Sequence, residues 1–293
     1  MTERQISYLN LALCILLWAS IPVASKKILV ELSNIQMLFW STVFSLAAMG
    51  GVLLFQGKMP ALVRQSWRSV GHMAFLGFLG AYLYYVLLYG AFARTAAAEG
   101  FILAYTWPIL VSLLAVVLLG EAFTLRKLAA VLVSFFGVVV IVTQGRIITV
   151  NFTSLSGDLL ALAGAFVFAL FSVLGKRARY DQTVSVFVYF AAALLAVALT
   201  VLATGGAGRP SGAVWPWLLY NGLLVNGVSY VFWFKALEHG DTFVVSNALY
   251  LTPFLSLLYV YLWLDEPILL SSVIGLLVIV AGIGLQAVRT GAG

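Results

Sequence analysis

The sequence predicts an all-α integral membrane protein with ten transmembrane helices. Of its 293 residues, 63% are hydrophobic and only 9% are charged, and its mean hydropathy is +1.08. A soluble domain typically carries about 25% charged residues, so an ordinary soluble protein, a disordered chain and a nucleic-acid-binding domain are excluded. The apolar runs are about 20 residues long, the length that a helix needs to cross a bilayer, and no strand alternation typical of an outer-membrane barrel is present.

Ten such runs follow one another along the chain, with short connections between them. The first run is followed by Ala24, as in a signal peptide, but nine further runs come after it. We therefore interpret it as a retained helix whose end is bent by Pro22. No connection is long enough to hold a soluble domain. The predicted spans are residues 8–25, 35–55, 70–92, 97–119, 127–143, 157–175, 183–203, 214–235, 243–263 and 268–288.

Basic residues set the predicted orientation. With ten spans, both ends of the chain lie on one side of the membrane. That side holds 11 of the 16 Lys and Arg residues, and the other side holds 5. Cytoplasmic loops carry an excess of Lys and Arg, so we expect both termini in the cytoplasm. The five residues on the outer side are Lys26, Lys27, Arg94, Arg146 and Arg209.

The chain also contains an internal repeat. A shift of 145 residues aligns the third to fifth spans with the eighth to tenth, and the matches include Tyr, Pro, Glu and Gly. Chance overlap of apolar stretches would not match these types together. We predict two five-helix repeats, residues 1–145 and 155–293, within one membrane domain. The aligned pairs include Gly77 and Gly222, Tyr85 and Tyr230, Tyr105 and Tyr250, Pro108 and Pro253, Glu121 and Glu266, and Gly137 and Gly282.

The odd number of spans in each repeat has a functional consequence. The second repeat must cross the membrane in the opposite sense to the first. Inverted repeats of this kind recur in transporters, where the substrate site lies near the midplane of the bilayer, between the repeats. The repeat therefore predicts a transporter that works by alternating access.

Charged residues are confined to the ends of the predicted spans and to the loops. Charge inside a bilayer usually marks an ion or proton pathway. The nearest exceptions, Glu99 and Asp158, each open a helix, where the helix dipole favours an acid. We expect a neutral or zwitterionic substrate and no proton coupling through a buried carboxylate. With the single cysteine Cys14, two histidines and no phosphate-binding loop motif, no metal, cofactor or ATP hydrolysis is expected.

Polar-tipped aromatic residues occupy the interior of the spans instead. Three tyrosines share one face of the third span, and Asn, Tyr and Trp form a comparable face on the eighth. Others lie beside Pro108 and Pro253, where each proline frees a backbone carbonyl. Such a set can stack on an aromatic ring and hydrogen-bond the polar end of an amino acid. The predicted substrate-binding residues are Tyr82, Tyr85, Tyr89, Tyr105, Asn226, Tyr230, Trp233, Asn247 and Tyr250.

Aromatic residues in membrane helices also have simpler roles. Any one of these tyrosines or tryptophans fits core packing or anchoring at the membrane interface. We interpret the tryptophans near the ends of spans as interfacial anchors. They are Trp67, Trp215, Trp217 and Trp263.

Several short motifs resemble a known family. They are Leu17-Trp18-Ala19, the pair Lys26-Lys27, the endings Leu119-Gly120-Glu121 and Leu264-Asp265-Glu266, and Gly137 and Gly282. With the ten spans, they resemble the drug/metabolite transporter superfamily, specifically its EamA-type ten-helix exporters, over nearly the whole chain. The aromatic content is most similar to that of the aromatic amino acid exporters. The resemblance implies a secondary transporter of a bacterial inner membrane that exports small metabolites, above all aromatic or other apolar amino acids.

Other classes of membrane protein remain open at this point. An exporter of other neutral metabolites or drugs would share the same features. A membrane enzyme acting on lipids would need a cluster of acids or histidines, and the nearest group is Glu238, His239 and Asp241. A channel or structural subunit would favour one polar stripe over two opposed halves. We expect a transporter rather than an enzyme, with a small-molecule substrate and membrane lipid as partners, no nucleic acid and no required oligomer.

Overall fold

The computed structural model describes residues 2–94, 97–149, 154–265 and 267–287, and every regular element in that part of the chain is a helix. The predicted all-α membrane fold is therefore confirmed. Eight helical segments among the described residues are long and apolar enough to cross a membrane, and the last helix is a shorter apolar one. The count of ten spans and the limits of the two repeats stay predictions.

The helices of the first half follow the predicted spans, with interruptions. The first span is divided at Ser20, because Pro22 in the first turn of α2 has no amide hydrogen to donate to the preceding turn. Thr2 and Ser33 cap the starts of α1 and α3. The side chain of each accepts a hydrogen bond from the backbone N–H three residues further along the chain. The elements are α1 (Glu3–Ala19), α2 (Ile21–Ile28), α3 (Asn34–Phe55), α4 (Met59–Val63), α5 (Trp67–Gly77), the π-helix η1 (Phe78–Leu83), α6 (Tyr84–Phe92), α7 (Ala97–Ala104), α8 (Trp107–Leu119), α9 (Leu125–Val142) and the short 3₁₀ helix η2 (Ile147–Thr149).

The second half repeats two of these interruptions. The eighth predicted span contains a π-helix, η3, as the third contains η1, and the ninth is divided just ahead of Pro253, as the fourth is ahead of Pro108. The sixth span is unbroken. The elements are α10 (Leu155–Ala178), α11 (Gln182–Ala203), α12 (Trp215–Tyr220), η3 (Asn221–Val228), α13 (Ser229–His239), α14 (Thr242–Ala248), α15 (Leu251–Leu264) and α16 (Leu270–Ala287).

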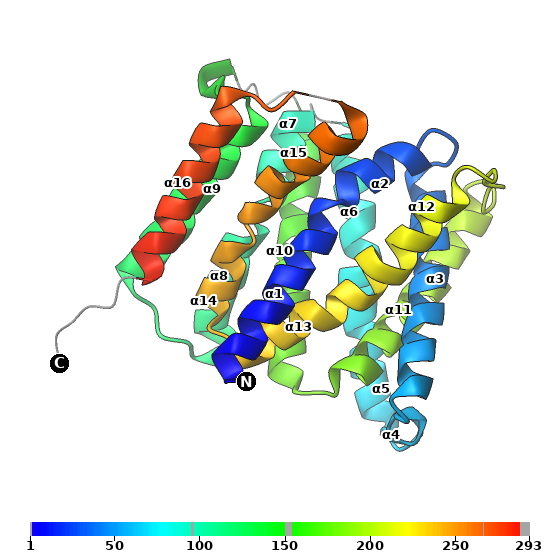
Figure 1. Ribbon diagram of the computed structural model, residues 1–293. Helices are drawn as coiled ribbons and strands as arrows, with labels where there is room; N and C mark the ends of the chain where they lie inside the picture. The colour runs from blue at the N-terminus through cyan, green and yellow to red at the C-terminus, as the bar shows by residue number, and fades with distance from the viewer. Residues whose placement is uncertain (1, 95–96, 150–153, 266, 288–293) are drawn as a thin grey trace.

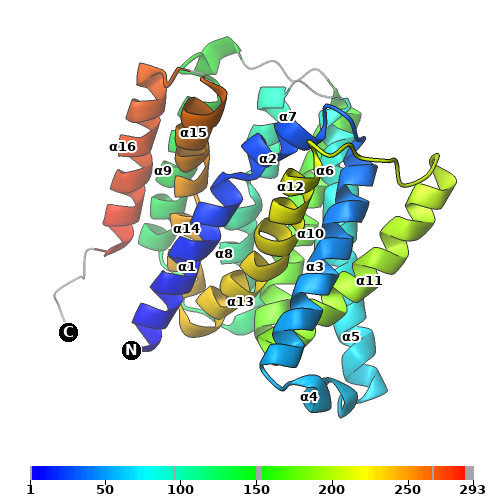
Figure 2. The same ribbon diagram turned by 45° about the vertical axis from the view of Figure 1, so that its right-hand side comes forward.

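Corresponding helices of the two halves meet at the edges of the bundle. Figures 1 and 2 show α9 beside α16 at one edge and α3 beside α11 toward the other, with α1, α10 and α13 between them. We call the face at which α1 begins the terminal face, and the other the opposite face. The helix α2, the start of α12 and the end of α15 lie toward the opposite face (Figure 1).

The interface between α9 and α16 contains the same contact twice. In one copy a glycine of α9 meets a carbonyl of α16, and in the other a glycine of α16 meets a carbonyl of α9. A methyl group at Gly137 of α9 would lie 2.6 Å from the carbonyl oxygen of Gly275 in α16. One at Gly282 of α16 would lie 2.7 Å from the carbonyl oxygen of Ala130 in α9. Both the glycines 137 and 282 and the carbonyls 130 and 275 are 145 residues apart. A two-fold relation between surfaces produces such an exchange of partners, and small residues let the two helices approach closely in lipid.

The same exchange occurs where the π-helices meet the other pair of helices. Gly77, just before η1, packs against the backbone of Tyr189 in α11. Gly222 in η3 packs against the side chain of Phe44 in α3. These positions are again related by the shift of 145 residues. Both halves therefore use the same small residues for close helix contacts.

Loops of both halves are tied together at the opposite face. The backbone N–H and the hydroxyl of Ser211 donate to the two carboxylate oxygens of Glu31, at 2.8 and 2.6 Å, and these hydrogen bonds lower the pKa of Glu31. In addition, Trp40 of α3 donates its indole N–H to the carbonyl oxygen of Ala207. The loop after α2 is thus joined to the loop between α11 and α12.

We predict that Gly282→Ala destabilises the protein, whereas Gly284→Ala on the same helix does not. The methyl group at 282 would press on Ser134 and on the carbonyl of Ala130, and overpacking of this kind costs typically about 1–3 kcal/mol. A methyl group at 284 would meet nothing within 4 Å. Thermal unfolding in detergent should show a lower Tm for the first variant alone. Equal Tm values for the two variants would show that the contact between α9 and α16 can accommodate an added methyl group.

Candidate functional site

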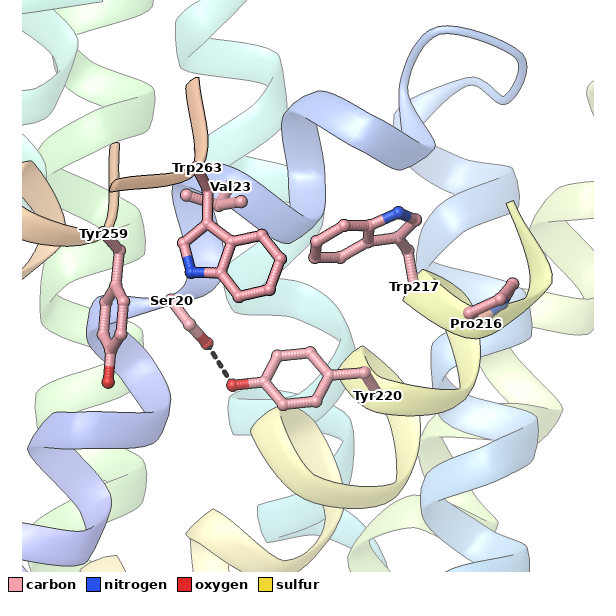
Figure 3. Close-up of a pocket in the computed structure, with 7 residues that line it drawn as sticks. All are labelled: Ser20, Val23, Pro216, Trp217, Tyr220, Tyr259 and Trp263. Atoms are coloured by element: carbon pink, nitrogen blue, oxygen red, sulfur yellow. Dashed lines mark hydrogen bonds between the residues drawn. The ribbon is translucent and has the colours of Figure 1, made fainter. Parts of the chain in front are cut away.

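A cavity of about 330 Å³ lies between α2, α12 and α15, toward the opposite face (Figure 3). Its volume falls at the lower end of the range for small-molecule sites, about 300–1,000 Å³. The helix α2 belongs to the first half and the other two helices to the second, so the cavity lies between the halves. None of the lining residues is charged. They are Ser20, Val23, Pro216, Trp217, Tyr220, Tyr259 and Trp263.

Aromatic rings form most of the cavity wall. The indole rings of Trp217 and Trp263 meet edge to face, with centroids 5.9 Å apart and planes at 85°. The ring of Tyr220 lies below them in Figure 3, and Tyr259 lies beside Trp263. Offset and edge-to-face rings of this kind offer both ring faces and ring edges to an aromatic ligand.

The polar part of the cavity comes from two hydroxyl groups. The oxygens of Ser20 and Tyr220 are 2.8 Å apart, and Ser20 also donates to the carbonyl oxygen of Leu17 at 2.7 Å. A serine hydroxyl has a single hydrogen, so Tyr220 must donate to Ser20. Both hydroxyl hydrogens are then engaged within the protein. What remains for a ligand is the unused lone pairs of the two oxygens, which accept hydrogen bonds.

A cluster of five aromatic residues lies next to the cavity, on the side of the terminal face. The ring of Trp18, two residues before Ser20, has its centroid between 5.7 and 6.3 Å from the other four rings. The cluster combines α1 and α8 of the first half with α10 and α13 of the second. We call it the central aromatic cluster. Its members are Trp18, Trp107, Phe168, Tyr230 and Trp233.

Two serines hold the indole groups of this cluster in place. The Nε1–H of Trp18 donates to Oγ of Ser229 at 2.8 Å, and that of Trp233 donates to Oγ of Ser172 at 3.1 Å. Trp233 and Ser172 are both fully buried. A buried indole N–H without an acceptor is costly, so these serines fix the orientation of the rings.

The nine residues predicted to bind substrate fall into separate groups. Tyr230 and Trp233 belong to the central aromatic cluster, and the hydroxyl of Tyr85 lies 3.4 Å from that of Tyr230. Tyr82, Tyr85 and Tyr89 do share one face, as predicted, but that face packs against α3 and α11. The hydroxyl of Tyr82 lies 2.7 Å from Oγ1 of Thr200 there.

The remaining predicted residues lie away from the cavity. Tyr105 and Tyr250 pack together beside α9, with the hydroxyl of Tyr250 donating to the carbonyl oxygen of Tyr105 at 3.4 Å. Asn247 is fully buried and donates to Oε1 of Gln286 in α16 at 2.8 Å. Asn226, in η3, is 8% exposed. None of the nine is among the seven residues that line the cavity, and their role in binding stays a prediction.

Sequence reasoning missed most of the cavity. It interpreted Trp217 and Trp263 as interfacial anchors, and their rings also meet across the cavity. It did not single out Ser20, Tyr220 or Tyr259. The available signals were weak: Ser20 precedes the bend at Pro22, and Tyr220 immediately precedes a π-helix that composition does not reveal.

The acidic group that an enzyme would need is engaged in contacts between helices. Asp241 pairs with Lys127 at 2.6 Å, and His239 pairs with Glu3. Glu238 accepts a hydrogen bond from Gln182 at 3.2 Å. Each group therefore has a structural partner from another helix or helix end. Of the two acids singled out at helix starts, Asp158 lies in the first turn of α10, and the side chain of Glu99 lies outside the described residues.

The fold defines a multi-pass membrane protein, and the cavity between its two halves is a candidate small-molecule site. Residues 5–143 and 155–287 match the EamA-like transporter family, and the chain belongs to that family. The family resemblance seen in the sequence is therefore confirmed. This membership indicates a transporter rather than an enzyme, with a small-molecule substrate and a lipid environment.

Two similar proteins carry transporter names, which is consistent with membership of this family. An uncharacterized transporter of Archaeoglobus fulgidus is 27% identical over 97% of this chain and 98% of its own length. The aromatic amino acid exporter YddG of Ancylobacter novellus is 26% identical over 83% of this chain and 84% of its own length. A solved crystal structure superposes with a TM-score of 0.85 over 97% of both chains at 22% identity, which shows the shared fold.

We predict that Ser172→Ala destabilises the protein by about 1–3 kcal/mol, because it leaves the buried indole N–H of Trp233 without its acceptor. Replacing both partners should cost less than the two single changes together. The double variant Ser172→Ala with Trp233→Phe tests this by thermal unfolding, since Phe brings no indole N–H. Strictly additive effects would show that the bond does not hold the ring.

Proposed function

We propose that the protein is a secondary transporter that exports aromatic or other apolar amino acids across a bacterial inner membrane, by alternating access between its two halves. The observation that carries this proposal is the uncharged cavity between the halves, lined by aromatic rings and two hydroxyl oxygens. The name of the relative YddG, an aromatic amino acid exporter, supports the same substrate class.

The lining of the cavity matches the two parts of such a substrate. The rings of Trp217, Tyr220 and Trp263 can pack against an apolar or aromatic side chain. The hydroxyl oxygens of Ser20 and Tyr220 have committed their hydrogens and can accept from an ammonium group. The phenol of Tyr259 and the indole of Trp263 provide donors for a carboxylate on the neighbouring wall (Figure 3).

The absence of charge from the cavity lining argues against ionic substrates. A substrate with a net charge would lose its hydration without gaining an opposite charge among the seven lining residues. A zwitterion has no net charge, and its two groups can be met by hydroxyls, indoles and backbone dipoles. Of the nine predicted residues, Tyr85, Tyr230 and Trp233 are the candidates for a deeper part of the path, because they lie in or beside the central aromatic cluster.

Export of other neutral metabolites or drugs is a second candidate function. The same uncharged lining would accept a neutral aromatic compound without an amino acid group. The two functions differ in whether the hydroxyl oxygens of Ser20 and Tyr220 contribute to binding. Transport assays with matched substrates separate them.

We predict that the purified protein in sealed vesicles exchanges phenylalanine and tryptophan faster than lysine or glutamate. Phenethylamine and 3-phenylpropionate, which each lack one of the two charged groups of phenylalanine, should be transported more slowly than phenylalanine. Radiolabelled counterflow against protein-free vesicles measures this. Transport of neutral aromatic compounds with no transport of amino acids would favour the second candidate, and no difference between lysine and phenylalanine would contradict both.

We predict that Trp217→Ala weakens substrate affinity, while Trp215→Ala leaves it unchanged. Trp217 faces the cavity, whereas Trp215, two residues earlier on α12, packs against Trp40 and Phe44. Loss of an aromatic contact worth about 0.5–1.5 kcal/mol corresponds to a loss of affinity of roughly two- to tenfold. Substrate-dependent thermal stabilisation measures the affinity and also checks folding. An equal loss in both variants would place the substrate elsewhere.

We predict that reporter fusions after Arg289 and within the loop near Arg146 report opposite sides of the membrane, with the fusion after Arg289 in the cytoplasm. The reason is the division of basic residues, 11 on the terminal side against 5 on the other. Fusions that report the same side would contradict the inverted arrangement of the two halves. Fusions on opposite sides in the reverse sense would contradict the orientation alone.

A further inference from the structure

A short corner between α13 and α14, residues His239–Thr242, is held at the terminal face by several other parts of the chain. Gly240 packs tightly against the hydroxyl of Ser7 in α1. That hydroxyl donates to the carbonyl oxygen of Ala236, at the end of α13, at 2.8 Å. The corner belongs to the second half of the chain and α1 to the first. Contacts at this corner therefore join the two halves.

A partly buried ion pair fixes the corner from the other side. The ammonium of Lys176, at the end of α10, donates to Oε1 of Glu121 at 2.9 Å, to the carbonyl oxygen of Gly240 at 2.9 Å and to Oγ1 of Thr242 at 2.8 Å. A lysine has three N–H donors, and all three are used. We call this group the terminal clamp. Its members are Glu121, Lys176, Gly240 and Thr242.

The carboxylate of Glu121 accepts hydrogen bonds from both Lys176 and Thr242. One of its oxygens accepts the backbone N–H of Thr242 at 3.1 Å, and the other accepts the hydroxyl of Thr242. Glu121 follows α8 and so belongs to the first half. The side chains of Lys176 and Glu121 are 17% and 18% exposed, so the protein shields this pair from water in part. Removal of one partner from a partly buried pair leaves the other charge without its counter-ion, which is unfavourable.

The two faces of the membrane domain differ in this respect. Toward the opposite face the halves line the cavity and are joined by the exposed contact between Glu31 and Ser211, whereas at the terminal face they are joined by the partly buried pair of Glu121 and Lys176. The pair Lys127 with Asp241 adds a further contact at the same corner, at 2.6 Å. The corner is thus held both to α1 and to Glu121 of the first half.

We propose that the terminal clamp is the gate of the terminal face, closed in this structure, and that Glu121 and Thr242 are positioning residues that set how often it opens. When the corner moves away, water reaches Glu121 and Lys176 and hydrates both charges. When it returns, each group regains its partner. The two arrangements are discrete, as a switch between two packed states requires. This inference rests on the proposed alternating access and not on the identity of the substrate.

The natural cysteine reports the opening directly. Cys14 is the only cysteine in the chain and is completely buried in α1. It lies eleven residues beyond Glu3, or about 16 Å along the helix from the terminal face. A maleimide can react with it only when the halves separate to that depth. The rate of alkylation by N-ethylmaleimide therefore measures the open fraction without any substrate.

We expect Glu121→Gln to raise the rate of Cys14 alkylation about tenfold, which corresponds to about 1.4 kcal/mol in the gating equilibrium. Thr242→Val should raise the rate in the same direction, because it removes the hydroxyl that links Lys176 to Glu121. Adding Lys176→Gln to Glu121→Gln should change the rate by less than about twofold further, since the two charges act as one unit.

Lys58→Gln is the matched control. Lys58 pairs with Asp181 at 2.7 Å between the end of α3 and the start of α11, where the two side chains are 35% and 36% exposed. This pair also joins the two halves and lies outside the corner. Its loss should leave the alkylation rate within about twofold of the original. Thermal unfolding of each variant establishes that the reaction is followed on folded protein.

The outcomes separate the gate from general loosening and from the proposed substrate. Equal acceleration in Lys58→Gln and Glu121→Gln, or no acceleration in Glu121→Gln and Thr242→Val, would overturn the gate. Acceleration confined to the clamp variants supports it, even if vesicle assays show no amino acid transport. In that case the proposed substrate would be contradicted, while the proposed gate would still be supported.

Discussion

A polypeptide inside a bilayer must satisfy its backbone amides and carbonyls from within the protein, and the rest of this structure depends on that requirement. Uninterrupted helices meet it everywhere along their length. Interruptions are tolerated only where side chains or a cavity take over the freed groups. At the break between α1 and α2, the hydroxyl of Ser20 donates a hydrogen bond to the carbonyl oxygen of Leu17 and accepts one from the hydroxyl of Tyr220. The cavity thus lies where a broken helix already requires polar groups from the other half.

Much of the fold could be predicted because lipid imposes a strong pattern on composition. The length of apolar runs located the helices to within a few residues, and Pro22, Pro108 and Pro253 lie at the breaks. The matched pairs Tyr85 with Tyr230 and Tyr105 with Tyr250 also contact each other in space, each pair 145 residues apart. Pattern matching could suggest these pairs, because both members occupy the same position in their half.

The site was harder to predict, because a single sequence does not give the rotation of each helix about its axis. The shared face of Tyr82, Tyr85 and Tyr89 was correct, yet the neighbours of that face are α3 and α11. The π-helices change the phase of side chains beyond them and have no signature in composition. The sequence identified Glu121 only as part of a repeated motif, because its partner Lys176 comes from a helix 55 residues further along the chain.

The reciprocal packing of Gly137 on Gly275 and of Gly282 on Ala130 has a consequence for how the two halves find each other. Each half carries both surfaces of the contact, so two separate halves could pair through it in the manner of a symmetric dimer. The connection between residues 143 and 155 makes that pairing intramolecular. At the effective concentration set by so short a tether, even a weak contact between the halves is kept occupied. The connection therefore keeps the two halves paired in the membrane even while other contacts between them rearrange.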